Sequence, residues 1–180
     1  MTPPNVQERT GLVTFKGTPM TLQGPALQTG APAPEFSLTA SDMATMTLES
    51  LVDGGKRAAM LIVVPSLDTS VCSLESQTFN RRLGELPEGV AAWVVSVDLP
   101  FAMARWAAAQ TGGMQLGMLS DYRDHSFGRA YGLYIAELDL LARAIVVIGK
   151  DKSVQYVQIV PEVAQEPNYD DALKAAAAAA

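Results

Sequence analysis

The chain has 180 residues, of which 48% are hydrophobic and 18% charged, as expected for one globular domain large enough to bury a full core. Its formal net charge of −6, without any basic cluster, argues against nucleic acid or an anionic membrane as the main partner. The polar first ten residues contain no apolar segment, no apolar run reaches the roughly 18 residues of a membrane span, and the single cysteine permits no intrachain disulfide, so we expect a cytoplasmic protein.

The first third of the chain predicts short strands and loops. Alternating apolar residues on either side of a Gly-Thr-Pro turn predict a hairpin, and several Gly and Pro residues predict a loop after it. In chain order, the expected elements are a polar arm over 1–11, hairpin strands over 12–15 and 20–22, a loop over 24–34, a short strand over 36–39 and a helical turn over 47–51.

Strands alternate with helices from residue 58 onward. The apolar run 58–64 predicts a strand covered on both faces, and apolar residues three and four apart predict a helix over 71–84. The remaining expected elements are a strand over 90–97, a helix over 101–110, a short strand over 116–119, a short helix over 125–131, strands over 142–148 and 154–160, and a helix from 170 to the C-terminus. The alternating pattern of 154–160 suits a strand near a sheet edge.

This order of elements predicts an α/β fold, with a central mixed sheet flanked by helices and an N-terminal β-hairpin. We place the domain over 12–175. The alanines at 176–180 are set apart as a low-complexity tail, which either extends the last helix or frays.

The one cysteine stands where a strand gives way to a helix. Pro65 to Val71 interrupt the apolar run, and Cys72 follows in the first turn of the expected helix. A thiol at this place feels the positive end of the helix dipole and several unpaired backbone N–H groups. Both favour the thiolate, which is the nucleophilic form. We therefore expect Cys72 to perform covalent chemistry.

The pattern Pro65-x-x-x-Thr69-x-x-Cys72 after a buried strand resembles the active-site loop of the peroxiredoxins, and the full run 65–72 resembles their thiol peroxidase branch. Residues 96–102, residues 142–148 and the hairpin region ending at 34–38 resemble further segments of that branch, in the same order. The resemblance extends over roughly residues 12–175 and implies a thioredoxin-like fold.

The resemblance also assigns roles. Cys72 is then the peroxidatic cysteine, Thr69 offers its hydroxyl to the bound peroxide, Pro65 shields the thiolate from water and Arg143 stabilises it. The implied activity is reduction of hydrogen peroxide and organic hydroperoxides through a sulfenic acid at Cys72, which thioredoxin or another external thiol reduces. It also implies a homodimer. We expect no cofactor and no metal, since one Cys and one His do not make a zinc site.

One position departs from the family pattern. The helix after the second buried strand usually carries a resolving cysteine, and this chain has Ala107 there. Since no second cysteine exists, the usual intramolecular disulfide is impossible. Either the protein runs a one-cysteine cycle, or the resolving residue was removed by substitution. The missing thiol raises a second hypothesis, a redox sensor or relay that passes oxidation to a partner. A third hypothesis is a thioredoxin-fold adaptor with an unreactive thiol.

Other interpretations of the single residues are weighed as well. Arg143 in an apolar strand also suits a structural ion pair with Glu75 or Asp68, because buried arginine is seldom unpaired. Thr69 also suits a helix cap. His125, the only histidine, is expected at the surface or at a helix start, with a Cys–His nucleophilic pair as the alternative.

Ionisation alone does not account for fast peroxide reduction. A thiol with a pKa near 8.5 is about 3% ionised at pH 7, and lowering the pKa to about 6 gains roughly 30-fold in thiolate. Thiolate nucleophilicity falls with pKa, which loses roughly 13-fold over the same range. The net gain is only about twofold, so most of the rate must come from positioning the peroxide and stabilising charge on the departing oxygen.

Overall fold

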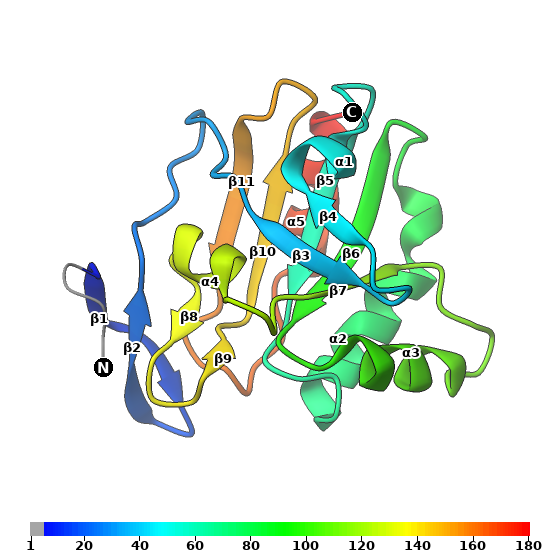
Figure 1. Ribbon diagram of the computed structural model, residues 1–180. Helices are drawn as coiled ribbons and strands as arrows, with labels where there is room; N and C mark the ends of the chain where they lie inside the picture. The colour runs from blue at the N-terminus through cyan, green and yellow to red at the C-terminus, as the bar shows by residue number, and fades with distance from the viewer. Residues whose placement is uncertain (1–5) are drawn as a thin grey trace.

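The computed structural model describes residues 6–180 (Figure 1). In chain order its elements are β1 (Glu8–Phe15), β2 (Thr18–Gln23), β3 (Ser37–Ala40), β4 (Thr45–Thr47), α1 (Leu48–Val52), β5 (Ala58–Val63), α2 (Ser70–Arg81), β6 (Val90–Ser96), α3 (Pro100–Ala108), β7 (Gly117–Ser120), α4 (Ser126–Ala130), β8 (Tyr134–Ile135), β9 (Leu140–Leu141), β10 (Ala144–Ile148), β11 (Val154–Ile159) and α5 (Tyr169–Ala178). A short 3-10 turn, Leu83–Glu85, follows α2.

A seven-stranded mixed sheet forms the centre of the molecule, in the order β11-β10-β5-β6-β7-β3-β4. Strands β5, β6 and β7 are parallel, and the others pair antiparallel. Every residue of β5 is buried. Because side chains alternate along a strand, Leu61 and Val63 enter one hydrophobic core while Met60 and Ile62 enter the other. The continuous apolar run of this strand therefore serves two layers of helices.

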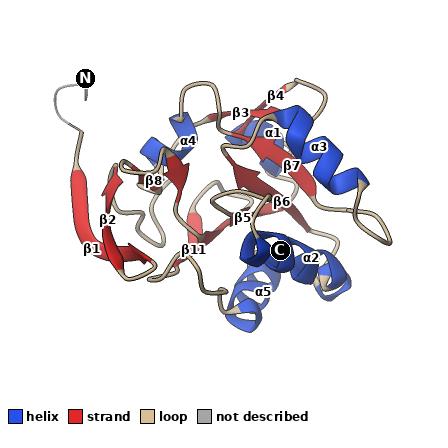
Figure 2. Ribbon diagram, turned by 90° about the horizontal axis from the view of Figure 1, so that it is seen from below, coloured by secondary structure: helices blue, strands red, loops and turns tan. Residues whose placement is uncertain are grey.

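Helices cover both faces of this sheet. Seen from below, α2 and α5 lie together on one side of the sheet and α1 and α4 on the other, with α3 beside β7 (Figure 2). Phe79 of α2, Met103 of α3 and Leu173 of α5 share one core with Ile62. Within residues 6–180, none of the helices combines the length and hydrophobicity needed to cross a membrane.

The N-terminal hairpin is confirmed, and it is longer than expected. Strand β1 begins at Glu8, and Glu8 and Arg9 of the expected arm pair with β2 before the register shifts; residues 1–5 lie outside the described part of the chain. The hairpin continues through β8 and β9 into a second sheet of order β1-β2-β8-β9. Val13, Leu22, Ile135 and Val163 form a small core beneath it.

Several chain segments meet at one end of the central sheet. Val63, the last residue of β5, lies opposite Val95 of β6 and Ala144 of β10. Ala144 in turn lies opposite Ile159, the last residue of β11. These strand ends therefore lie at the same end of the sheet, the lower one in Figure 1. The loops after β5, β6 and β11 begin there, and so does the residue before β10.

Three details differ from the sequence-based expectations. Strands β4, β8 and β9 were not expected; each has only two or three residues, too few for a periodic pattern. Strand β10 begins at Ala144 rather than 142, so Arg143 precedes the strand. The alanines do not form a frayed tail over their whole length, because α5 continues to Ala178 and Ala176 is fully buried.

Candidate active site

Cys72 lies in the first turn of α2, as expected, and only 1% of it is exposed. Thr69 occupies the N-cap position in an extended conformation, yet its side chain does not cap the helix. The Thr69 hydroxyl instead donates to the Ser66 carbonyl at 2.9 Å. Thr69 therefore stands at the N-cap position, but the prediction that its side chain caps the helix is wrong. The first-turn N–H groups of α2 are left free of a threonine cap, close to the cysteine.

Arg143 reaches the cysteine from the start of β10. Its Nη2 lies 3.2 Å from the Cys72 sulfur, and its Nε donates to the Val163 carbonyl at 2.9 Å. Its Nη1 pairs with the Glu75 carboxylate, and the arginine is 1% exposed. Of the two ion pairs considered from the sequence, the structure forms the one with Glu75. The same guanidinium also contacts the sulfur, a geometry that is compatible with both the structural and the functional interpretation.

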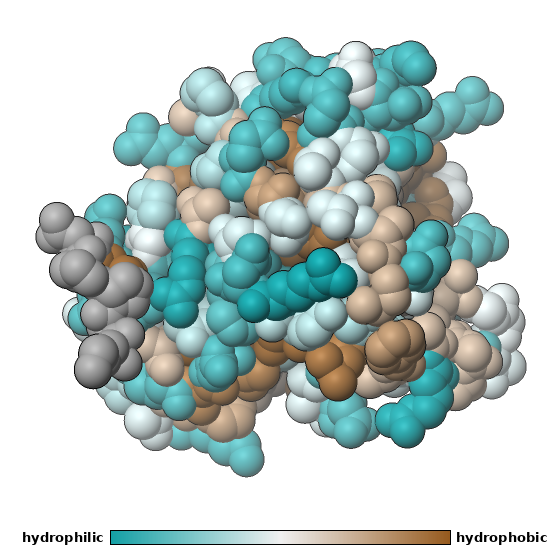
Figure 3. Space-filling view, viewed as in Figure 1, coloured by the Kyte–Doolittle hydropathy of each residue, from teal (hydrophilic) through white to brown (hydrophobic). Residues whose placement is uncertain are grey.

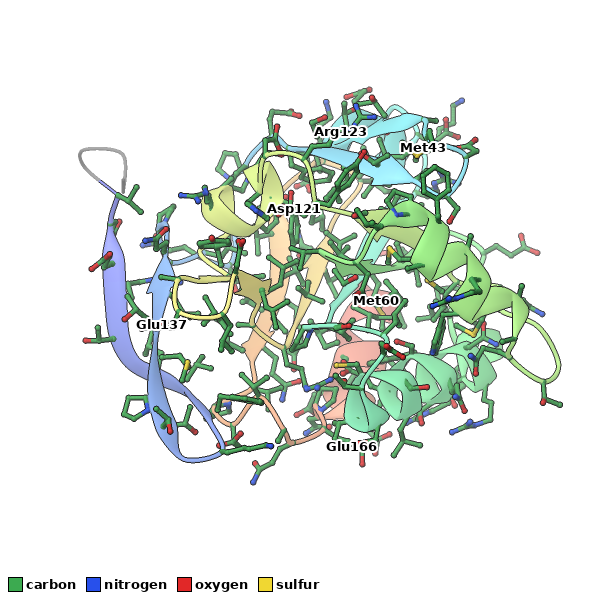
Figure 4. The ribbon with its side chains drawn as sticks, turned by 60° about the horizontal axis from the view of Figure 1, so that its bottom comes forward. Met43, Met60, Asp121, Arg123, Glu137 and Glu166 are labelled. Carbon is green, nitrogen blue, oxygen red and sulfur yellow. The ribbon has the colours of Figure 1, made fainter. Side chains whose placement is uncertain are left out.

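Glu75 was expected only as a possible ion-pair partner of Arg143, and the structure places it within the site. It stands three positions after Cys72, on the same face of α2, and is fully buried. Burial raises the pKa of its carboxyl to about 7, against the opposing attraction of Arg143, and Glu166 adds a smaller increase. Figure 4 shows Glu166 near α2, at the lower edge of the molecule.

Arg143 stays protonated in this environment. Burial lowers the pKa of the guanidinium, and the charges of Glu75 and Cys72, with their hydrogen bonds, outweigh that effect and raise it overall. A fixed positive charge therefore stands beside the sulfur. A charge at this place can stabilise an anion that forms next to it.

A pocket of about 340 Å³ opens above the sulfur and brings the four expected site residues together. Pro65, Thr69, Cys72 and Arg143 all line it. Its remaining wall comes partly from the same loop and helix start, with Ser66, Ser70 and Val71, and partly from distant segments, with Phe15, Lys16, Leu138, Leu140, Val163 and Ala164. Most of these side chains are apolar, so the pocket suits a molecule with a small polar group and a hydrophobic body.

Acidic side chains fix the segments that build this wall. Glu162 accepts hydrogen bonds from the N–H groups of Lys16, Gly17 and Ala164, and these bonds lower the pKa of its carboxyl to about 2. The hairpin turn that carries Phe15 is thereby attached to the loop that carries Val163. Glu137, beside β2 in Figure 4, accepts from the Thr21 N–H with both oxygens.

His125 is a helix-start residue, as expected, and does not pair with the cysteine. It holds the N-cap position of α4, and its Nε2 lies 3.2 Å from the Asp139 carboxylate. The same helix is held by Asp121, which accepts from the N–H groups of Phe127 and Gly128. Figure 4 shows Asp121 close to α4. Burial raises the pKa of Asp121 to about 6.

Three comparisons with known proteins agree with this geometry. The Redoxin family model matches residues 28–173. A thiol peroxidase of Halalkalibacterium halodurans is 46% identical over 93% of this chain and 98% of its own length, and a thiol peroxidase of Bacillus subtilis is 40% identical over 92% and 96%. The crystal structure of a peroxiredoxin-like protein from Aquifex aeolicus superposes with a TM-score of 0.82, at 37% identity over 92% of this chain and 96% of that chain.

Proposed function

The chain belongs to the Redoxin family, and we propose from this membership and the site geometry that it is a thiol peroxidase whose reacting atom is the Cys72 sulfur. The expected resemblance to the thiol peroxidase branch and the expected thioredoxin-like fold are both confirmed. The relatives' names favour an enzyme over a redox relay or an unreactive adaptor. The observation that supports the site assignment most strongly is the 3.2 Å contact between Arg143 Nη2 and Cys72 Sγ.

The proposed reaction begins with attack of the Cys72 thiolate on the terminal oxygen of a hydroperoxide. The O–O bond breaks, sulfur is oxidised to a sulfenic acid, and the departing oxygen takes a proton to become an alcohol or water. One external thiol then forms a mixed disulfide with Cys72 and releases water. A second thiol reduces that disulfide and restores the cysteine. Both reducing equivalents come from outside the chain, since Cys72 has no cysteine partner.

The surrounding groups suit this step. Arg143 supplies a permanent charge where the departing oxygen becomes negative, which is the largest contribution expected in such a site. The Thr69 hydroxyl gives its only proton to the Ser66 carbonyl, so toward the pocket it offers lone pairs. A hydroperoxide O–H can donate to them and be oriented. Pro65 is buried beside the sulfur and has no N–H to attract water.

Reductant, location and assembly belong to the same proposal. Thioredoxin or a small thiol acts as reductant, and a chain with a single buried cysteine suits the reducing cytoplasm. A homodimer is supported by large hydrophobic side chains left exposed: Leu74 on α2, Leu99 just before α3 and Phe101 within it, exposed by 45%, 55% and 68%. Figure 3 shows hydrophobic residues gathered on the lower part of the molecule, where α2 and α3 lie.

A coupled assay tests the proposal. Purified protein is given hydrogen peroxide or tert-butyl hydroperoxide with thioredoxin and its reductase, or with dithiothreitol, and peroxide loss is followed beside reductant oxidation. We expect steady turnover that Cys72→Ser abolishes. Rapid oxidation of Cys72 once, with no turnover by any thiol, would overturn the enzyme assignment and favour the relay.

A further inference from the structure

We propose that Asp98 is a positioning residue for the peroxide site. Its carboxylate holds the loop between β5 and α2 so that the Thr69 hydroxyl keeps its orientation toward the pocket. The inference rests on the proposed peroxidase function and adds a residue from a distant part of the chain. Asp98 is absent from the pocket wall around Cys72, so it acts on the reaction only through other residues.

The Asp98 carboxylate accepts three hydrogen bonds, two of them from the loop. Its Oδ1 accepts from the Ser66 hydroxyl at 2.7 Å, and its Oδ2 accepts from the Leu67 N–H at 2.8 Å. The third comes from Ser96 Oγ at 2.8 Å. Bonds to a carboxylate are about twice as strong as bonds between neutral groups. The carboxylate therefore fixes both the backbone and a side chain of the loop.

Asp98 is itself held firmly at the ends of two strands. Its N–H donates to Ser96 Oγ at 3.1 Å, and its carbonyl accepts from the Ser120 hydroxyl. Ser96 ends β6 and Ser120 ends β7, and the two residues lie opposite each other in the sheet. The anchor point of the loop is thus part of the rigid sheet edge rather than of another loop.

Ser66 carries this anchoring on to Thr69. The Ser66 hydroxyl donates to Asp98, while the Ser66 carbonyl accepts from the Thr69 hydroxyl at 2.9 Å. A shift of Ser66 would release the Thr69 proton and let that hydroxyl rotate. The path Asp98–Ser66–Thr69 therefore joins the end of β6 to the group proposed to orient the peroxide.

Packing on the other side of the loop does not replace these bonds. A second pocket, of about 440 Å³, separates the loop from α3 and is bordered by Leu67, Asp98 and Trp106. Leu67 of the loop is nevertheless 2% exposed and packs in the same core as Met103 of α3, so van der Waals contacts hold the loop at Leu67. Ser66, which also borders this pocket, is only half-buried, and its hydrogen bond to Asp98 restrains the part of the loop that bonds to Thr69.

The positioning role predicts a selective defect. Removing the carboxylate should lower kcat/KM for hydroperoxide by about tenfold to a hundredfold, since small misplacements of an orienting group have effects of this size. Alkylation of Cys72 by iodoacetamide needs the thiolate but no oriented hydroperoxide. We therefore expect its rate to change by less than about threefold in the same variant. A loss of fold would reduce both rates.

The experiment compares Asp98→Ala, Asp98→Asn and wild type, with circular dichroism and thermal unfolding to verify the fold. The amide of Asp98→Asn retains one acceptor oxygen for the Leu67 N–H, so we expect it to restore part of the peroxide rate. Asp68→Asn is the matched control, because this carboxylate lies on the same loop, is exposed and does not line the Cys72 pocket. Asp68→Asn should retain the wild-type peroxide rate.

A double-mutant cycle with Thr69→Val tests the path itself. If Asp98 acts through the Thr69 hydroxyl, Asp98→Ala should lower the peroxide rate much less in the Thr69→Val background than in wild type. Equal effects in both backgrounds, or parallel losses of peroxide and alkylation rates, would overturn the inference. The inference would also be overturned if wild type is active and Asp98→Ala reduces peroxide at the same rate. If wild type itself shows no peroxidase activity, the proposed peroxidase function is contradicted instead.

Discussion

Arg143 Nη2 lies 3.2 Å from the Cys72 sulfur while Nη1 of the same guanidinium pairs with Glu75. One buried cation thus serves two acidic groups, which are three residues apart on one face of α2. When Glu75 is neutral, the whole positive charge is available to the thiolate. When Glu75 is ionised, the two anions compete for it, and each disfavours the other. Glu75 therefore sets how strongly Arg143 supports the reactive form of the cysteine.

Glu75→Gln tests this competition. The amide keeps an acceptor for Arg143 and removes the anion. Since the pKa of Glu75 is about 7, we expect the variant and wild type to be alkylated by iodoacetamide at similar rates at about pH 5.5, and the variant to become faster, by about threefold or more, near pH 8. Glu88→Gln, an exposed site, is the control. A rate ratio that does not change with pH would contradict the competition.

The same carboxyl makes stability depend on pH. The folded-state pKa of Glu75 lies above its ordinary value of 4.5, so its contribution to the free energy of unfolding is complete below about pH 4.5 and declines as pH rises through about 7. The decline is on the order of 3 kcal/mol. Urea unfolding of wild type and Glu75→Gln across this range should show a steeper fall for wild type. Two parallel curves would mean that Glu75 ionises normally in the folded protein.

Arg143→Met should slow the peroxide step far more than it lowers thiolate reactivity. Loss of a charge beside the departing oxygen is expected to reduce kcat/KM by about a hundredfold to a thousandfold. The rate of alkylation by iodoacetamide should also fall, but by a factor at least about tenfold smaller, because alkylation forms no anion on a departing oxygen. Stopped-flow measurement of both reactions decides the matter.

The control for Arg143→Met concerns the Glu75 carboxyl, which loses its partner in this variant. Arg143→Met leaves Glu75 buried without its partner, which destabilises the fold whatever the role of the arginine in the chemistry. The double variant Arg143→Met with Glu75→Gln removes that problem and should show the same selective loss. Equal losses in both reactions would mean that the arginine acts only through the ionisation of the cysteine.

The sequence was sufficient for the elements with strong patterns and for the local part of the site. The apolar run of β5, the spacing within α2 and the position of Cys72 between them were all predictable, because each depends on neighbours in the chain. The hairpin was also predicted, but its first strand was expected to begin at residue 12, whereas β1 begins at Glu8. The Gly11 position interrupts the alternation, and the register shifts between Arg9 and Val13.

The rest of the site depends on contacts that no local pattern contains. The Asp98 bonds to Ser66 and Leu67 span 32 and 31 positions, and Phe15 joins the pocket from a hairpin near the other end of the chain. The sequence offered Glu75 and Asp68 equally as partners of Arg143, and only the fold selects Glu75, 68 positions away. Tertiary packing, rather than propensity, decides which of these side chains meet.

Cys72 should over-oxidise readily. Without a resolving thiol the sulfenic acid persists, so excess peroxide should carry it to sulfinic acid, a gain of roughly 32 mass units against roughly 16 for sulfenic acid. Intact mass spectrometry after peroxide treatment without reductant measures this. A product that stops at one added oxygen would contradict the prediction.

Ala107→Cys provides the matching gain of function. We expect a thiol there to intercept the sulfenic acid and to lower the sulfinic fraction, with a disulfide found by peptide mapping. Ala108→Cys is the control, because its side chain lies one position further around α3 and is exposed, whereas Ala107 is half-buried against the same core as Cys72. Equal protection by both variants would point to disulfides between chains instead.

The apolar pocket wall predicts a preference among peroxides. Leu140 borders the pocket from β9, and Leu140→Ala removes contact with the body of an organic substrate. We expect KM for cumene hydroperoxide to rise about fivefold or more, since a few methyl groups contribute about 1–2 kcal/mol, while hydrogen peroxide is little affected. Leu12→Ala, exposed on β1 and outside the pocket, should change neither constant. A similar effect on both peroxides would indicate a disturbed site rather than a lost contact.

The exposed phenylalanine of α3 provides a test of the proposed homodimer. Phe101 is 68% exposed and stands two residues from the exposed Leu99, an arrangement that is costly for a chain that stays monomeric. Light scattering after gel filtration should give twice the 19.1 kDa chain mass for wild type and the single chain mass for Phe101→Glu, because a buried unpaired carboxylate disfavours association. Leu12→Glu is the control, because it introduces the same charge at an exposed hydrophobic residue on β1. This variant should remain dimeric. A monomeric wild type, or dissociation by both variants, would contradict an interface at α3.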